Sequence, residues 1–412
     1  MQSPGDERVK SKSDKYIPYQ GIDNFVGRRK LLQYALYFIS AGGFAIFGVK
    51  LRDSWNPSKE NIVDSYPRTV PTQDPTKVTL KPEQTESPAP GTTPTPNTAK
   101  EPPKPKKTET PTPPETNTIP GLIEDSFSFE TVKVSEQGEV IQRESKATKM
   151  WIEDLGNGIK LEMVYVPSGT FTMGSPADEK GRQKNEEPQR KVTIRPFLMG
   201  RFLVTQALWK YVSTLPRVGI DLPSDPSYFK GNLRPVERIS WYEAREFCAR
   251  LSRATNREYR LPSESEWEYA CRAGTTTPFY FGKSITTKLV NYDGSIVYNR
   301  EQKGIYRERT TEVGTFPPNN YGLFDMHGNV WEWCADHFHE NYRKALSNES
   351  AWYSNNENAK RVIRGGSWFT SPKRCRSANR SFFLPDKRTA PSGIEGPGFR
   401  VVCMAAVNSL FQ

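Results

Sequence analysis

The sequence predicts an α+β domain in which short strands and long ordered loops surround a few helices. Three observations favour this fold class. Apolar and polar residues alternate, as in half-buried strands, through much of the segment from residue 127 to residue 205. Two helices with clear start signals follow. After Gly274 the chain is rich in Gly, Asn, Pro and aromatic residues and lacks helical periodicity. We therefore expect one sizeable core between about residues 127 and 406.

The strand predictions rest on four runs. Turn signals such as Pro-Ser-Gly separate or interrupt them. The runs are "FSFETVKV" (127–134), "EVIQRE" (139–144), "KLEMVYVPSGTFTMGS" (160–175) and "RKVTIRPFLMGRFLVT" (190–205).

The helix predictions rest on capping boxes, in which a serine is followed three residues later by a glutamate. Ser240 and Glu243 start one helix, and Ser263 and Glu266 start another, for which Gly274 is a plausible stop. A shorter helix begins near Thr205. At helical spacing the apolar residues form one face of each capped helix: Trp241, Ala244, Cys248 and Leu251 in the first, and Trp267, Ala270 and Cys271 in the second.

The N-terminal region predicts a membrane anchor. Arg28 and Arg29 precede an uncharged run, residues 31–49, which is about long enough to span a bilayer. The arginine pair resembles a bacterial twin-arginine export signal, and no clear cleavage site follows. We expect an uncleaved anchor at 28–52, with a cytoplasmic head at 1–27 and the remaining chain in the periplasm or at the cell surface. The alternative is a buried helix of a soluble domain.

Residues 53–120 predict a disordered linker rich in Pro, Thr and Lys. Nearly half of the 34 prolines lie there, and aromatic residues are rare. Such a segment buries too little apolar surface to offset the entropy of ordering, so we expect an extended, semi-rigid spacer. A strand-containing lead-in at 121–160 follows, and then the main domain at 161–406.

The net charge of +11 does not indicate a nucleic-acid partner. Much of the basic excess lies in the tail and spacer, and no element carries a continuous basic stripe with interleaved aromatics. We expect no nucleic-acid binding.

Six motifs, in this order, resemble the formylglycine-generating enzyme or sulfatase-modifying factor family. The resemblance covers about residues 161–403 and implies a loop-rich variant of the C-type lectin fold. It also implies an activity: copper-dependent oxidation, with molecular oxygen, of a sulfatase cysteine to formylglycine. The motifs are "LEMVYVPSGTFTMGS", "RPVERISWYEAREFCARLS", "YRLPSESEWEYACRAG", "FPPNNYGLFDMHGNVWEW", "VIRGGSW" and "GFRVV".

The resemblance also implies structural calcium held by loop oxygens. In "DMHGNVWE", Asp325 and Glu332 would give side-chain oxygens, and Gly328 and Val330 would give carbonyls. Asn291 and Tyr292 lie where the family's second calcium site begins, but its later carboxylate is replaced near Lys303. A hydrogen-bonded turn without an ion is the alternative. His337 and His339 could bind a transition metal, but no third ligand is evident.

The cysteines decide whether oxidase chemistry is available. Copper(I) needs two thiolates, which the family's enzymes carry in the loop after Gly-Gly-Ser. Counting forward from Ser367, Thr370 falls at the first cysteine position and Cys375 at the second. Counting backward from Arg380, Cys375 falls near a structural cysteine of the family. On either count the catalytic pair is missing, and Cys375 is a catalytic candidate only if the protein is an oxidase.

The family's structural disulfides imply two bridges in this chain, Cys248–Cys403 and Cys271–Cys375, with Cys334 unpaired. Bridges of this kind form in exported proteins and typically stabilise by ~2–4 kcal/mol.

The arginines around Cys375 have two interpretations. They could form a pocket for a carboxylate or phosphate, or they could tie down loops through hydrogen bonds to carbonyls and acidic side chains. The second is favoured, because loop-rich folds must satisfy many buried backbone groups with side chains. These arginines are Arg374, Arg376, Arg380, Arg388 and Arg400.

Three functions follow. The favoured one is a membrane-tethered, non-oxidase recognition module that presents the surface of loop 368–390 to a protein or glycan. The final segment is similar to that of the variable binding proteins of diversity-generating retroelements. The alternatives are a copper-dependent oxidase acting on a sulfatase, and an accessory domain for an unknown partner. The expected ligand contacts are Trp368, Phe369, Thr370, Ser371, Asn379, Ser381, Phe382, Phe383, Leu384 and Lys387.

Overall fold

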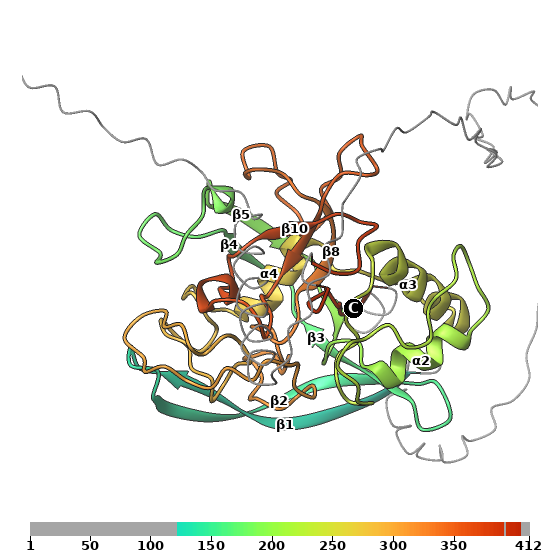
Figure 1. Ribbon diagram of the computed structural model, residues 1–412, viewed down its shortest axis with the longest axis horizontal. Helices are drawn as coiled ribbons and strands as arrows, with labels where there is room; N and C mark the ends of the chain where they lie inside the picture. The colour runs from blue at the N-terminus through green and yellow to red at the C-terminus, as the bar shows by residue number, and fades with distance from the viewer. Residues whose placement is uncertain (1–121, 391–392, 405–412) are drawn as a thin grey trace, which may run out of the picture. The chain divides into compact units, whose positions relative to one another are not determined.

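Antiparallel pairing of segments from both ends of the domain builds the main sheet (Figure 1). The structure is a computed structural model that describes residues 122–390 and 393–404. The sheet has the strand order β1-β2-β3-β6-β11-β7. Its strands are β1 (Leu122–Val134), β2 (Val140–Asp154), β3 (Lys160–Val166), β6 (Phe197–Gly200), β7 (Tyr259–Arg260) and β11 (Val402–Cys403). The last described strand, β11, thus lies between β6 and β7 and joins the two ends of the domain in one sheet.

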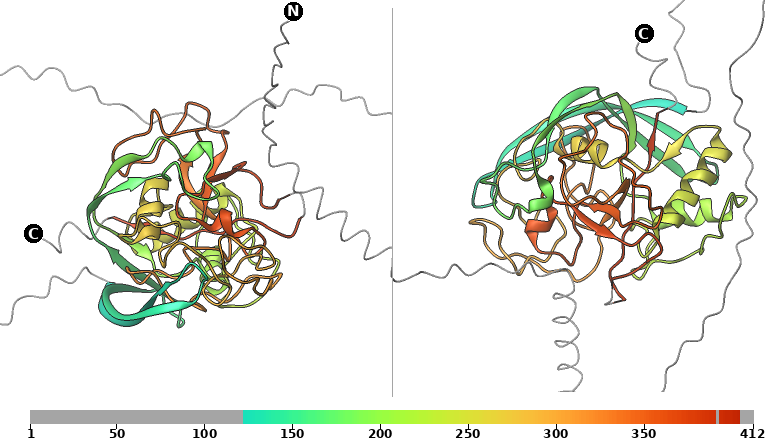
Figure 2. Two further views of the ribbon diagram at one scale, coloured as in Figure 1. Left: turned by 90° about the vertical axis from the view of Figure 1, so that its left-hand side faces the viewer. Right: turned by 90° about the horizontal axis from the view of Figure 1, so that it is seen from above.

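The lead-in is part of this sheet. β2 pairs with β1 along nearly its whole length and with β3 at its end. The pattern at 139–144 predicted only the start of β2. The strand continues through the largely polar residues 145–149, which break the alternation, and then through buried Met150 and Trp151 to Asp154. Figure 2 shows the β1–β2 hairpin curving along one side of the domain.

Two smaller sheets and three helices complete the fold. The smaller sheets have the orders β10-β9-β8 and β4-β5. Their strands are β4 (Gly169–Met173), β5 (Arg190–Ile194), β8 (Glu332–His337), β9 (Arg361–Arg364) and β10 (Ser381–Phe383). The helices are α2 (Gln206–Thr214), α3 (Trp241–Thr255) and α4 (Glu264–Arg272), with 3-10 turns at Lys184–Glu186 and Pro372–Cys375.

All three helices begin where the sequence predicts. Thr205 caps α2, and complete capping boxes at Ser240 and Ser263 start α3 and α4. Helix α4 ends one residue earlier than expected, because Ala273 already adopts the left-handed conformation. Between α4 and β8 the described chain has loops and isolated bridges without a regular helix or strand, as predicted.

The main sheet is covered on both faces. Successive residues of a strand point to opposite faces. Accordingly, Met163 packs with the residues of α2 and α3, whereas Val164 packs with those of α4. The predicted apolar faces of α3 and α4 are buried in these two clusters. A third cluster consists mainly of residues of the loop at 279–298, together with two valines of β1 and Cys375.

Buried arginine–glutamate pairs link the loops to the regular elements. Arg376 pairs with Glu179 and Glu186, and Arg380 pairs with Glu264. Arg364, Arg376, Arg380 and Arg400 are fully buried. Arg388 binds Glu243, the capping-box glutamate of α3. These contacts agree with the second interpretation of the arginines around Cys375, in which they tie down loops through bonds to acidic side chains.

The predicted head, anchor and spacer at 1–120, together with residues 405 and 406, lie outside the described residues. In the part of the chain that the structure describes, no helix is long and apolar enough to cross a membrane.

We predict that R400M will lower the free energy of unfolding by ~3–5 kcal/mol, because it leaves the Glu332 carboxylate buried without its partner. Both side chains are fully buried, and both carboxylate oxygens accept from Arg400, at 2.7 and 2.9 Å. Urea denaturation measures the change. R217M is the matched control: it breaks the exposed Arg217–Asp221 pair and should cost less than ~1 kcal/mol. Equal losses in the two variants would contradict the prediction.

Candidate functional site

The Gly-Gly-Ser-Trp segment forms a sharp turn directly after β9. Gly365 and Gly366 adopt positive φ values of 90° and 75°, a conformation that glycine reaches without steric cost. A Cβ atom on Gly366 would lie 2.7 Å from the Cys375 sulfur. The turn therefore packs against Cys375 without room for a side chain.

Hydrogen bonds hold this turn in place. The Ser367 backbone N–H donates to the Thr370 hydroxyl oxygen at 3.0 Å, and the Thr370 N–H donates to the Ser367 carbonyl at 3.1 Å. The Trp368 N–H reaches the Asn329 carbonyl at 2.9 Å, and the Asp293 N–H reaches the Thr370 carbonyl at 3.0 Å. Segments more than 30 residues away therefore fix the position of Thr370.

Cys375 is a buried, neutral thiol beside Thr370. Its sulfur has no solvent exposure and lies 3.7 Å from the Thr370 hydroxyl oxygen. Burial raises the pKa of the Cys375 thiol to about 12, and the hydrogen bond between this thiol and the Thr370 hydroxyl opposes the shift only in part. Because the thiolate is the nucleophile and the metal ligand, the thiol is inert at neutral pH.

The site does not fit copper. Copper(I) prefers a pair of thiolates, and the structure places an alcohol oxygen next to the single sulfur of Cys375. This arrangement agrees with forward counting from Ser367, which puts Thr370 at the first cysteine position.

Neither predicted disulfide is formed, because Cys248, Cys271 and Cys375 are free thiols. The Cys271 sulfur instead contacts the His327 ring, 3.8 Å from Nδ1, and the Ser377 hydroxyl at 3.7 Å. The His327 ring also bonds to the Cys375 carbonyl, so it fills the region into which the Cys271 sulfur points. Cys334 is a buried free thiol.

His327 has a structural role. Its Nδ1–H donates to the Cys375 carbonyl at 2.7 Å, and its Nε2 accepts from the Tyr280 N–H at 3.1 Å. Burial lowers the pKa of His327 to about 3, so the ring is neutral. Both ring nitrogens are thus occupied by the protein.

The two carboxylates predicted to bind calcium accept hydrogen bonds from other groups of the protein. Both Glu332 oxygens bind Arg400, so this carboxylate does not fit a calcium site. Asp325 accepts from the Gly314 N–H at 2.8 Å, and burial raises the pKa of its carboxyl to about 6. Among the described residues, no group of three or more His, Cys, Asp or Glu side chains is placed to hold a metal ion.

The other predicted calcium ligands lie in varied surroundings, and the Asn291 Oδ1 atom is buried without a hydrogen-bond partner. The Asn291 side chain donates to the Arg309 carbonyl at 2.9 Å, and the Tyr292 hydroxyl donates to the Ile285 carbonyl at 3.4 Å. The Gly328 N–H donates to the Gly365 carbonyl, which joins this turn to the Gly-Gly turn. Val330 is buried in the core.

The expected ligand-contact residues divide into two groups. Trp368, Asn379 and Ser381 are buried, so their assignment to a binding surface is corrected. The amide of fully buried Asn379 donates to Glu186 at 3.4 Å, within the arginine–glutamate network. The others keep solvent-exposed surface: Phe369, Thr370, Ser371, Phe382, Phe383, Leu384 and Lys387.

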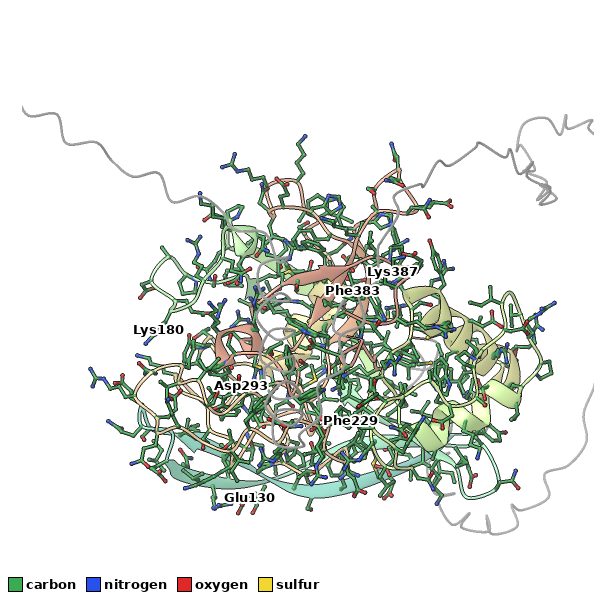
Figure 3. The ribbon with its side chains drawn as sticks, in the orientation of Figure 1. Glu130, Lys180, Phe229, Asp293, Phe383 and Lys387 are labelled. Carbon is green, nitrogen blue, oxygen red and sulfur yellow. The ribbon has the colours of Figure 1, made fainter. Side chains whose placement is uncertain are left out.

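Trp368 anchors an aromatic cluster that sequence reasoning did not reveal. Its ring lies edge-on to the Phe229 ring, stacks on the Tyr306 ring and contacts the Phe369 ring. The distances between the ring centroids are 5.3, 6.2 and 5.4 Å, respectively. Phe229 and Tyr306 come from distant loops and carry no motif. Figure 3 shows Phe383 and Lys387 close to β10, with Phe229 apart from them. The exposed aromatic residues therefore occupy two areas, one near Trp368 and one at β10.

A family profile and curated relatives show the family to which the domain is similar. The profile described as "Sulfatase-modifying factor enzyme 1-like domain" matches residues 157–405. An inactive Cα-formylglycine-generating enzyme 2 of Bos taurus is 30% identical over 61% of this chain and 90% of its own length. A formylglycine-generating enzyme of Mus musculus is 29% identical over 56% of this chain and 73% of its own length. The structure of PvdO from Pseudomonas aeruginosa is 35% identical, with a TM-score of 0.49, and covers 59% of this chain and 94% of PvdO.

We predict that Cys375 will resist iodoacetamide in the folded protein. Because its folded pKa of about 12 lies above the ordinary value of roughly 8.5, raising the pH from 7 to 9 should not increase alkylation. Peptide mass mapping without reductant measures the alkylated fraction.

Unfolding in urea without reductant is the control, and there Cys375 should be labelled. Rapid labelling of the folded protein would indicate a reactive thiol. Labelling in urea that requires reductant would indicate the Cys271–Cys375 bridge after all.

Proposed function

This chain belongs to the sulfatase-modifying factor enzyme 1-like family, and we propose that it is a non-oxidase member that recognises a ligand with the surface of loop 368–390. The ligand is a protein or a glycan. The matching relatives include proteins named formylglycine-generating enzyme and proteins named inactive formylglycine-generating enzyme. The function must therefore be argued from the site.

One observation carries the non-oxidase part of the proposal: the Thr370 hydroxyl stands 3.7 Å from the only cysteine sulfur in this loop. An alcohol does not replace a thiolate as a copper(I) ligand. Burial also keeps Cys375 protonated and shielded from solvent, so it lacks the thiolate that attack on a substrate requires.

The partly exposed side chains of the loop support recognition. Each phenylalanine of the loop packs against a second aromatic ring. The ring centroids are 5.4 Å apart for Phe369 and Trp368, 4.7 Å for Phe382 and Phe338, and 6.0 Å for Phe383 and Trp333. Aromatic rings held by a packed base lose little conformational entropy on binding, which favours affinity. Leu384 adds an apolar side chain that is 44% exposed, and Lys387 adds a charge.

We also propose that residues 31–49 tether the domain to a bacterial cell membrane, with the folded part outside the cytoplasm. The arginine pair before this uncharged run supports that orientation. A polyproline-like spacer at 53–120 would hold the recognition surface away from the membrane.

We predict that the full-length protein will not convert cysteine to formylglycine. The protein is incubated with copper(I), oxygen and a peptide containing Cys-x-Pro-x-Arg, and mass spectrometry follows the peptide. The expected result is unmodified peptide, because the thiolate pair is missing. A formylglycine-generating enzyme from a relative serves as the positive control, and turnover by this chain would refute the non-oxidase proposal.

We predict that L384D will abolish ligand binding, because it puts a charge into the exposed apolar area at β10. A glycan array probed with the full-length protein measures binding. L346D is the matched control, since Leu346 is 42% exposed and lies outside the loop. Binding that is lost with L384D and kept with L346D is the expected result. A glycan bound equally by both variants would place recognition elsewhere.

A further inference from the structure

A hollow of about 390 Å³ lies between Arg234 and the loop at 305–315. Its lining contains three arginines, Arg234, Arg307 and Arg309, and one acidic residue, Glu312. The hollow shares no residue with loop 368–390. It adjoins the Trp368 cluster, because Tyr306 stacks on Trp368 between the two lining residues Ile305 and Arg307.

The arginines of this hollow are not paired with carboxylates among the described residues. Among the described residues, Arg234, Arg307 and Arg309 form no ion pair with a carboxylate, and Glu312 is not paired with any of them. The fully buried arginines elsewhere in the domain differ, since Arg364, Arg376, Arg380 and Arg400 each pair with glutamate. Burial lowers the pKa of Arg307, which reflects the cost of holding its charge there.

Two polar atoms of the lining have no hydrogen-bond partner. They are Arg307 Nη1 and Thr311 Oγ1, and both are buried from solvent. Buried polar groups are normally satisfied, so two such atoms on residues that line one hollow indicate a missing acceptor. A ligand oxygen could accept from both the guanidinium and the hydroxyl.

The protein holds the arginines in place without using all their donors. Arg307 Nη2 donates to the Thr287 carbonyl at 2.7 Å, and the guanidinium lies 5.2 Å from the Phe316 ring centroid. Arg234 Nη1 bonds to the Thr310 carbonyl. Arginines fixed in this way are suited to bind planar or tetrahedral oxyanions with paired hydrogen bonds.

We propose that this hollow binds an oxyanion group, a phosphate or a carboxylate, with Arg307 Nη1 and Thr311 Oγ1 as its central donors. Arg234 and Arg309 supply further positive charge, and Glu312 limits the net charge of the site. This site is separate from the recognition surface of loop 368–390 and would exist even if that surface bound nothing.

The test is calorimetric titration of the full-length protein with inorganic phosphate, phenyl phosphate and acetate at constant ionic strength. We expect at least one of the three to bind with a Kd of about 1 mM or tighter. Higher salt should weaken that binding, because the contacts are electrostatic. Preference for phosphate and its ester identifies a phosphate site, and comparable acetate binding extends it to carboxylates. No binding by any of the three overturns the proposal.

Variants locate the binding. R307M should raise the Kd at least about tenfold. R253M removes the same charge from an exposed position on α3 and should change the Kd less than twofold. If circular dichroism shows that R307M is unfolded, T311V and R309M replace it, because each removes one donor of the same hollow. Equal affinity in the wild type and in the folded hollow variants would overturn the proposal.

Discussion

The burial of arginine side chains is the constraint on which the loop-rich part of this domain depends. A guanidinium group leaves water only where carboxylates and carbonyls replace its hydration. Arg376 meets this need at Glu186, which lies 190 residues earlier in the chain, and Arg380 meets it at Glu264, at the start of α4. These ion pairs set the path of loop 368–390, which forms few backbone hydrogen bonds of the β-sheet kind. They therefore also fix where Thr370 and the exposed phenylalanines lie.

The same dry interior decides which groups carry charge. Burial raises the pKa of Cys271 and Cys375 to about 12 and lowers that of His327 to about 3, so these groups are neutral at physiological pH. The fully buried arginines Arg364, Arg376, Arg380 and Arg400 each pair with a glutamate in this interior. Such an interior can position a binding surface, but it does not generate a thiolate. The hollow at Arg307 stands apart, because its guanidinium lacks a carboxylate partner.

Local features of the fold could be predicted from the sequence, and long-range contacts could not. The capping boxes at Ser240 and Ser263 are complete, because each involves residues only three apart. The predicted Cys271–Cys375 bridge is absent because family spacing does not show which side chain packs against a sulfur, and here the Cys271 sulfur lies against the His327 ring. Asn379 was assigned to the surface, yet its amide is buried against Glu186, since an arginine-rich loop does not reveal which of its polar residues turn inward.

By itself, the sequence determined the family, the helix starts and the presence of a single cysteine in loop 368–390, since these depend on residue identity and short spacing. Only the tertiary structure decided the protonation of Cys375, the commitment of Glu332 to Arg400, and the grouping of Trp368 with Phe229 and Tyr306. It also decided that Arg307 and Thr311 line one hollow. The physical reason is that burial and pairing depend on segments that are far apart in the chain, and only the packed fold brings these segments together.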